Sequence, residues 1–151
     1  MTKRSPKFQA VLFDIDGTLL DTTEVLFQSF EHTLATYNVS KNREEIRQEI
    51  GKHISQIYKN LAPGIDQNKL IDTHFAFQSN ILHVATVFPH VFETLKILRA
   101  QKIKTGVFSN RIRTSRKSLE LAGLTPLFDL IITAEDVTHP KPHPEIIEKA
   151  L

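Results

Sequence analysis

Two aspartates separated by a single residue, Asp14 and Asp16, offer the clearest chemistry in this 151-residue sequence. They follow a short apolar run and precede Gly17 and Thr18. Side chains alternate along a strand, so the two carboxylates face the same side. Two carboxylates held this close repel each other unless a proton or a cation lies between them. The pair could therefore supply a nucleophile, a proton-transfer group and oxygen ligands for a hard cation such as Mg²⁺.

A central strand of a parallel sheet has to position this pair. The apolar residues tolerate burial on both faces, which predicts a strand over 7–13. In open α/β sheets, ligands bind just beyond the carboxyl ends of the strands. Gly17 permits a turn that a Cβ atom would resist, and Thr18 adds a hydroxyl group. Asp-Gly is also a common turn signal, so a strand end with acidic turn residues is the alternative without chemistry.

A second polar strand end is Ser109-Asn110, after a strand predicted over 103–109 and before a helix over about 112–122. A hydroxyl group and the free N–H groups of a helix N-terminus together bind anions. A Ser-Asn pair often only caps a helix, which is the alternative here. The basic residues that follow are typical of a solvated helix face, with Arg111 placed closest to a substrate anion. These basic residues are Arg111, Arg113, Arg116 and Lys117.

A proline-rich loop follows a third predicted strand, 127–133, and presents Lys141. Alternating prolines at 140, 142 and 144 fix an extended backbone, so the lysine has little conformational freedom. A cation held in advance offsets negative charge that grows in a transition state. His139 and His143 would form a metal-binding pair on a helix, but the prolines prevent that helix, so we expect no metal there.

The residues between the first two predicted strands have helical periodicity, and Asn42 with Glu45 forms a capping-box signal. This pattern predicts an all-helical insert at 21–86, with the sheet-containing core formed by 1–20 and 87–151. The four predicted helices of the insert span about 22–38, 42–51, 54–61 and 66–81. Further helices are predicted over 90–101 and from Glu145 onward.

The composition excludes several classes of protein. Hydrophobic residues make up 40% and charged residues 24%, which is ordinary for a globular chain and argues against disorder. The absence of cysteine excludes disulfides, thiolate metal sites and a thiol nucleophile. No apolar run is long enough to cross a bilayer, so we expect a cytoplasmic protein without a membrane partner. The net charge of +2 is too small to indicate nucleic-acid binding.

Three segments in order resemble the motifs of the haloacid dehalogenase-like (HAD) hydrolase superfamily. The segment from Asp14 to Leu19 resembles the first motif, Ser109-Asn110 the second, and the segment from Lys141 to Glu145 the third. The resemblance implies an α/β fold with a Rossmann-like parallel sheet. It also implies that the helical insert is a cap that selects the substrate.

The resemblance assigns a role to each site residue. Asp14 would be the nucleophile that becomes phosphorylated, and Asp16 the general acid and base. Both aspartates would hold Mg²⁺, and Lys141 would neutralise charge around the nucleophile and the phosphate. The remaining phosphate-binding residues would be Gly17, Thr18, Ser109 and Asn110.

The function implied is a Mg²⁺-dependent phosphatase that hydrolyses a small phosphomonoester, phosphoglycolate-like or pyrophosphate-like, through an aspartyl-phosphate. A phosphomutase of the β-phosphoglucomutase type shares the same residues and is one alternative. Another is a non-catalytic binding module that keeps the fold. A signalling receiver domain also phosphorylates an aspartate, but the insert at 21–86 argues against it.

A fourth motif, a further strand ending in acidic metal ligands, does not follow Glu145 in this sequence. The sheet would then be incomplete at its C-terminal end, and the first strand would be an exposed edge. We therefore expect either a fragment of a longer enzyme or a chain completed by a partner. A homo-oligomer formed through that edge is one such arrangement.

Overall fold

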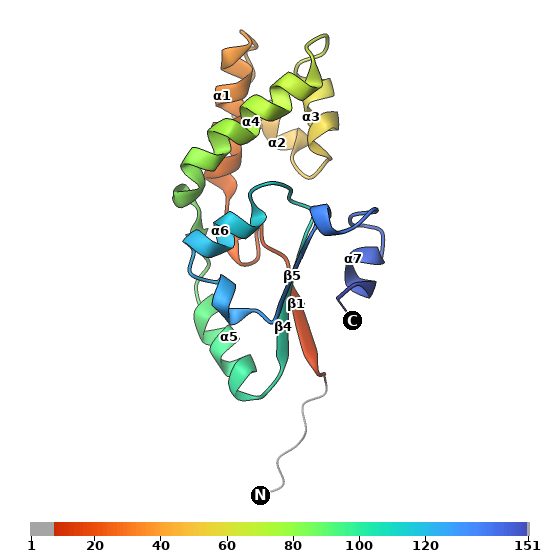
Figure 1. Ribbon diagram of the computed structural model, residues 1–151. Helices are drawn as coiled ribbons and strands as arrows, with labels where there is room; N and C mark the ends of the chain where they lie inside the picture. Colours follow the sequence, from red (N-terminus) through yellow and green to blue (C-terminus); the bar gives the residue numbers. More distant parts are fainter. Residues whose placement is uncertain (1–7, 151) are drawn as a thin grey trace, which may run out of the picture. The chain divides into compact units, whose positions relative to one another are not determined.

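The computed structural model describes residues 8–150 (Figure 1). The first residue of the predicted strand 7–13, Lys7, lies outside the described residues, as do residues 1–6 and Leu151. The chain divides into two compact units. The core unit contains the described residues up to Thr22 and from Ala85 onward, and the helical unit contains 23–84.

Among the described residues of the core unit, a parallel sheet of three strands, in the order β1-β4-β5, forms the centre. Phe13 lies opposite Val107, and Ser109 lies opposite Thr133, so the three carboxyl ends meet at one edge of the sheet. This arrangement confirms the predicted α/β fold with a parallel sheet. Within residues 8–150, β1 is an edge strand of this sheet. The strands span Ala10–Phe13 (β1), Lys104–Ser109 (β4) and Leu130–Thr133 (β5).

The core of this unit is formed by apolar side chains from the sheet, the turn after β1 and the flanking helices. Ile15, Val107 and Leu119 are each fully buried, and each such side chain stabilises the fold by roughly 1.5–3 kcal/mol. In Figure 1, α5 and α6 lie on one side of the sheet and α7 lies on the other. These helices span Val91–Ala100 (α5), Ser115–Leu121 (α6) and Glu145–Glu148 (α7).

A short antiparallel ribbon lies where the chain leaves and re-enters the core unit. Its strands are β2 (Leu20–Asp21) and β3 (Thr86–Val87), and Asp21 pairs with Thr86. The chain therefore enters the helical unit only after Thr22. Short 3₁₀ helices lie in the connections, and within 8–150 these are η1 (Leu82–Val84), η2 (Thr125–Leu127) and η3 (Ala134–Asp136).

The helical unit contains four α-helices around its own apolar core, in which Phe30, Tyr58 and Leu70 are buried. The capping box predicted at Asn42 is present, because its side chain accepts the Glu45 N–H and Glu45 accepts the Asn42 N–H. The helices span Thr23–Thr36 (α1), Arg43–Glu49 (α2), Ile54–Leu61 (α3) and Gln67–Ile81 (α4). No helix within residues 8–150 has the length and apolar character needed to cross a bilayer.

Candidate active site

The two aspartates lie at the carboxyl end of β1, on a tight turn. Asp14 and Asp16 are partly exposed, whereas Ile15 between them is buried. All three residues lie beyond Phe13, the last residue of β1, so the turn and not the strand sets these orientations. The N–H groups of Leu19 and Leu20 both donate to the Ile15 carbonyl at 3.0 Å. This turn requires a left-handed backbone, and Gly17 supplies it with a φ of +75°.

Lys141 makes a direct ion pair with the first aspartate. Its Nζ atom lies 2.9 Å from Asp14 Oδ2 and 4.5 Å from the centre of the Phe108 ring at the end of β4. The Oδ1 atom of Asp14 accepts the Ile15 N–H at 2.8 Å. The proline-rich loop thus brings its lysine to the carboxyl edge of the sheet.

Asn110 connects the end of β4 to this loop through its side chain. Asn110 Nδ2 donates to the Lys141 carbonyl at 2.8 Å, and the Lys141 N–H donates to Asn110 Oδ1 at 2.7 Å. Both polar ends of the amide are therefore used to hold the backbone of Lys141. The phosphate-binding role predicted for Asn110 stays a prediction, and the contact with the backbone of Lys141 is an interaction that the sequence did not indicate.

The second aspartate contacts a hydroxyl group and a buried cation. Thr22 Oγ1 donates to Asp16 Oδ1 at 2.7 Å, and Arg111 Nη1 lies 3.1 Å from the same oxygen. The Arg111 side chain is only 8% exposed, and its Nε atom donates to Thr114 Oγ1 at 2.9 Å. Burial lowers the pKa of Arg111, and the negative charge of Asp16 opposes that shift. Sequence reasoning treated Arg111 as a possible contact for a substrate anion and missed its pairing with Asp16.

The other predicted phosphate-binding residues lie at the same edge of the core unit. Ser109 is buried at the end of β4, and its Oγ atom accepts the Arg111 N–H at 3.2 Å. Gly17 and Thr18 are exposed on the turn that carries the aspartates. Asp14 thus contacts a residue of the proline-rich loop, Lys141, and Asp16 contacts Arg111, which follows the end of β4.

The donor atoms available for a metal ion at this edge are hard oxygens. Two partly exposed carboxylates on one short turn match the oxygen ligands that Mg²⁺ prefers. Asp14 and Asp16 therefore fit the metal-binding role predicted for them, which stays a prediction.

His139 and His143 lie side by side, although the prediction was that only a helix would pair them. Their ring centres are 4.8 Å apart although no helix connects them. Contrary to the prediction from the prolines, the loop is not extended at this point but turns: the His143 N–H donates to the Pro140 carbonyl at 3.1 Å. This turn brings the two rings together beside Glu145. The prolines prevent a helix, as expected, but they do not keep the two rings apart.

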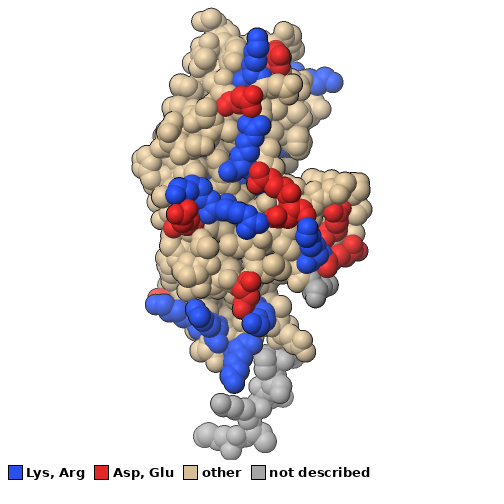
Figure 2. Space-filling model, in the orientation of Figure 1, with Lys and Arg blue, Asp and Glu red and all other residues tan. Residues whose placement is uncertain are grey.

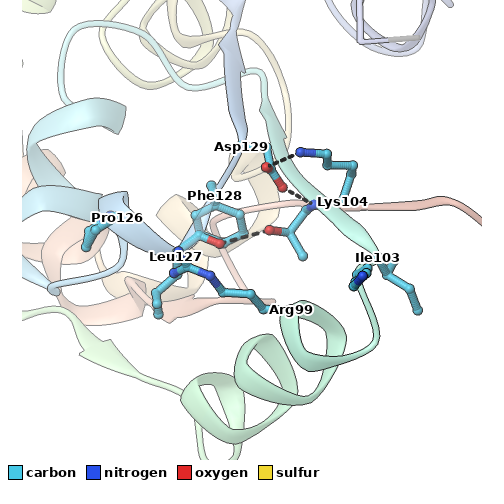
Figure 3. Close-up of a pocket in the computed structure, with 9 residues that line it drawn as sticks. Arg99, Ile103, Lys104, Pro126, Leu127, Phe128 and Asp129 are labelled. Carbon is cyan, nitrogen blue, oxygen red and sulfur yellow. Dashed lines mark hydrogen bonds and ion pairs between the residues drawn. The ribbon is translucent and has the colours of Figure 1, made fainter.

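A pocket of about 410 Å³ lies at the other end of the sheet (Figure 3). It is lined by Arg99 and Phe128, and by Lys104, whose Nζ atom lies 2.9 Å from Asp129 Oδ1. Lys104 begins β4 and Ser109 ends it, so this pocket is remote from the two aspartates. On the face shown in Figure 2, acidic and basic side chains are interspersed, with several basic side chains close together at the lower end of the core unit.

The chain is similar in sequence to known pyrophosphatases. The chain is 37% identical over 148 residues to the pyrophosphatase PpaX of Oceanobacillus iheyensis, covering 95% of this chain and 67% of that protein. It is 38% identical over 145 residues to the pyrophosphatase PpaX of Bacillus pumilus, covering 93% and 66%. The chain thus spans about two thirds of the length of these relatives.

Solved structures agree on the fold. A HAD-superfamily hydrolase of subfamily IA from Geobacter sulfurreducens superposes with a TM-score of 0.75 at 25% identity, covering 95% of this chain and 71% of that one. A haloacid dehalogenase-like family hydrolase from Streptococcus pneumoniae gives a TM-score of 0.83 at 18% identity, covering 95% and 69%. The profile of the haloacid dehalogenase-like hydrolases matches residues 11–151. The chain therefore belongs to the haloacid dehalogenase-like hydrolase family.

Proposed function

We propose that the core unit carries the catalytic centre of a Mg²⁺-dependent phosphatase for a small phosphorylated metabolite, with inorganic pyrophosphate as the first substrate to test. The observation that carries this proposal is the Asp14–Lys141 ion pair, at 2.9 Å, with Asp16 two residues away on the same turn. The relatives at 37% and 38% identity named pyrophosphatase support the choice of substrate.

In the first half of the proposed reaction, a carboxylate oxygen of Asp14 attacks phosphorus. The new bond joins Asp14 to the phosphoryl group, and the bond from phosphorus to the leaving oxygen breaks. Asp16 donates a proton to that leaving oxygen. In the second half, Asp16 accepts a proton from water, the water oxygen bonds to phosphorus, and the aspartyl-phosphate bond breaks to release inorganic phosphate.

The surrounding residues support this sequence by position and charge. Lys141 offsets the negative charge that builds up near Asp14, while Ser109 and the turn at Gly17 and Thr18 supply donors to the phosphoryl oxygens. A Mg²⁺ ion held by Asp14 and Asp16 would screen the repulsion between carboxylates and phosphate. Asn110 and Arg111 act on Lys141 and Asp16 respectively, by holding them in place.

The test is phosphate release by the purified protein with Mg²⁺, measured for pyrophosphate and for a panel of small phosphomonoesters. The Asp14→Asn variant should lose release for every substrate. Asp129→Asn is the matched control, because Asp129 pairs with Lys104 at 2.9 Å at the far end of the sheet. Equal release by wild type and Asp14→Asn would refute the proposal.

Trapping the intermediate separates this mechanism from direct attack by water. Peptide mapping of the quenched reaction should find one added phosphoryl group on the peptide that contains Asp14. Phosphate release without that adduct, in a trap that captures a known aspartyl-phosphate, would contradict covalent catalysis. Conversion of a sugar phosphate that depends on added sugar bisphosphate, without net phosphate release, would identify a phosphomutase instead.

A further inference from the structure

Two histidines and a glutamate that the proposed reaction does not use lie together on the proline-rich loop. One potential ligand atom from each of His139, His143 and Glu145 lies within 4.8 Å of the other two. Both histidine side chains are exposed, and Glu145 is half-buried. The cluster is thus accessible to a metal ion from solvent.

Two backbone hydrogen bonds hold the glutamate in place. The Thr138 N–H donates to Glu145 Oε1 at 2.7 Å, and the His139 N–H donates to Oε2 at 2.9 Å. His139 Nδ1 also lies 2.9 Å from Oε2, so the first histidine ring is already directed at the carboxylate.

We propose that His139, His143 and Glu145 form a binding site for a borderline transition-metal ion of the Zn²⁺ type. Two imidazole nitrogens and one carboxylate oxygen are a common three-ligand set for zinc, with water in the open position. Bonds of about 2.0–2.2 Å to a tetrahedral ion separate ligand atoms by roughly 3.3 Å. The ligand atoms, which lie within 4.8 Å of one another, would thus have to approach by about 1.5 Å, and rotation of the exposed imidazole rings allows this.

This site differs in chemistry from the pair of aspartates. Imidazole nitrogens favour Zn²⁺, Cu²⁺ or Ni²⁺, whereas the all-oxygen donors of Asp14 and Asp16 favour Mg²⁺. The two sites should therefore be distinguishable by competition between metals. A lone histidine–carboxylate ion pair, without a second imidazole, is the simpler explanation that the experiment has to exclude.

A metal ion at this site would restrict the loop that carries Lys141. Lys141 lies between the two histidines in the sequence, with its backbone held by Asn110 and its Nζ atom on Asp14. A metal ion bound at His139 and His143 would cross-link the loop on both sides of Lys141. Any effect of this cross-link on turnover rests on the proposed phosphatase function, whereas metal binding itself does not.

Calorimetric titration of the protein with Zn²⁺, in a large excess of Mg²⁺, tests the site directly. Wild type and Asp14→Asn should each bind one ion per chain at this site. His139→Asn and His143→Asn should bind at least about tenfold more weakly, because each removes one of three ligands. Asparagine can keep a polar atom near the position of Nδ1, which in His143 accepts the Glu145 N–H at 3.2 Å.

His90→Asn is the matched control. His90 and Glu93 also form an exposed histidine–carboxylate pair, with His90 Nδ1 2.7 Å from Glu93 Oε2. Within residues 8–150, this pair is not part of a group of three possible metal ligands. Its φ of +66° is one that asparagine tolerates, so the substitution should not disturb the backbone. Zn²⁺ affinity should be unchanged in this variant.

A second readout does not depend on the stability of any variant. Of the seven histidines in wild type, His139 and His143 should be the two whose ring signals in NMR spectra change with the first equivalent of Zn²⁺. Unchanged affinity in both His139→Asn and His143→Asn would overturn the proposal, as would loss of binding in Asp14→Asn or no Zn²⁺ binding by wild type. Asp14→Asn should lose phosphatase activity and keep Zn²⁺ binding. The failure of one proposal can therefore be told apart from the failure of the other.

Discussion

The side-chain amide of Asn110 makes two hydrogen bonds to the backbone of Lys141. It donates to the Lys141 carbonyl at 2.8 Å and accepts the Lys141 N–H at 2.7 Å. Asn110 directly follows the last residue of β4, so this contact ties a rigid strand end to the proline-rich loop. The lysine side chain then spans to Asp14 at the end of β1. The position of the cation is thus set by two strand ends of one sheet.

Replacing Asn110 by alanine should lower kcat by about tenfold to hundredfold, because two hydrogen bonds of about 0.5–1.5 kcal/mol each no longer hold Lys141. Asn80→Ala, which removes an exposed amide of α4, is the control and should keep the wild-type rate. Initial rates over a range of substrate concentrations check this. A KM increase with unchanged kcat would show that Asn110 binds substrate instead of positioning Lys141.

Replacing Lys141 by methionine should reduce kcat by about 10²–10³-fold, the cost of removing one group that stabilises charge in a transition state. Lys104→Met is a close control, because Lys104 also lies 2.9 Å from an aspartate oxygen but at the opposite end of the sheet. Thermal unfolding should confirm that both variants fold. Equal activities of the two variants would remove Lys141 from the proposed mechanism.

Arg111→Met should lower kcat by about tenfold or more while KM changes little, because the guanidinium contacts Asp16 and is itself buried. It should also destabilise the fold, since breaking a buried pair leaves a charge with fewer partners. Arg116→Met is the control: Arg116 pairs with Asp136 at 2.9 Å but is mostly exposed. A large rise in KM for Arg111→Met would instead indicate direct contact with a substrate anion.

The sequence predicted those parts of the site that depend on local patterns. Asp14 and Asp16 follow an apolar strand, and Lys141 is flanked by prolines, so residue type and spacing were sufficient to make them candidates. The strand itself, β1, is only partly buried, because it lies at the edge of the described sheet. The parallel sheet and the four helices followed from periodicity. The ribbon formed by β2 and β3 was missed because each strand has only two residues, too few to show alternation.

The contacts that sequence reasoning missed join residues far apart in the chain. The pairing of Arg111 with Asp16 depends on how the end of β4 packs beside the turn after β1, and no local pattern reports it. The hydrogen bonds between Asn110 and the Lys141 backbone likewise depend on the path of the loop after β5. For His139 and His143, the prolines predict only that no helix forms, whereas the turn that brings the two rings together depends on the path of the folded loop.

The helical unit carries an acid-sensitive charge cluster at Glu24. Arg43 Nη2 lies 2.8 Å from Glu24 Oε1, and the hydrogen bonds of Arg43 and then Gln28 lower the pKa of Glu24 to about 2 from its ordinary value of 4.5. A carboxyl group whose pKa is depressed on folding stabilises the fold above its unfolded pKa. That stabilisation should therefore be present above pH 4.5 and be lost as the pH falls toward 2.

Arg43→Met should accordingly lower the midpoint of thermal unfolding near neutral pH, and its difference from wild type should shrink as the pH falls from 4.5 toward 2. Arg47→Met is the matched control, because Arg43 and Arg47 both lie over the Phe27 ring. Arg47 pairs with a different carboxylate, Glu44, at 3.5 Å. Added salt should reduce the effect of Arg43, since the cluster is exposed. A difference between wild type and Arg43→Met that stays constant across this pH range would show that Arg43 acts by packing on Phe27 and not through the charge of Glu24.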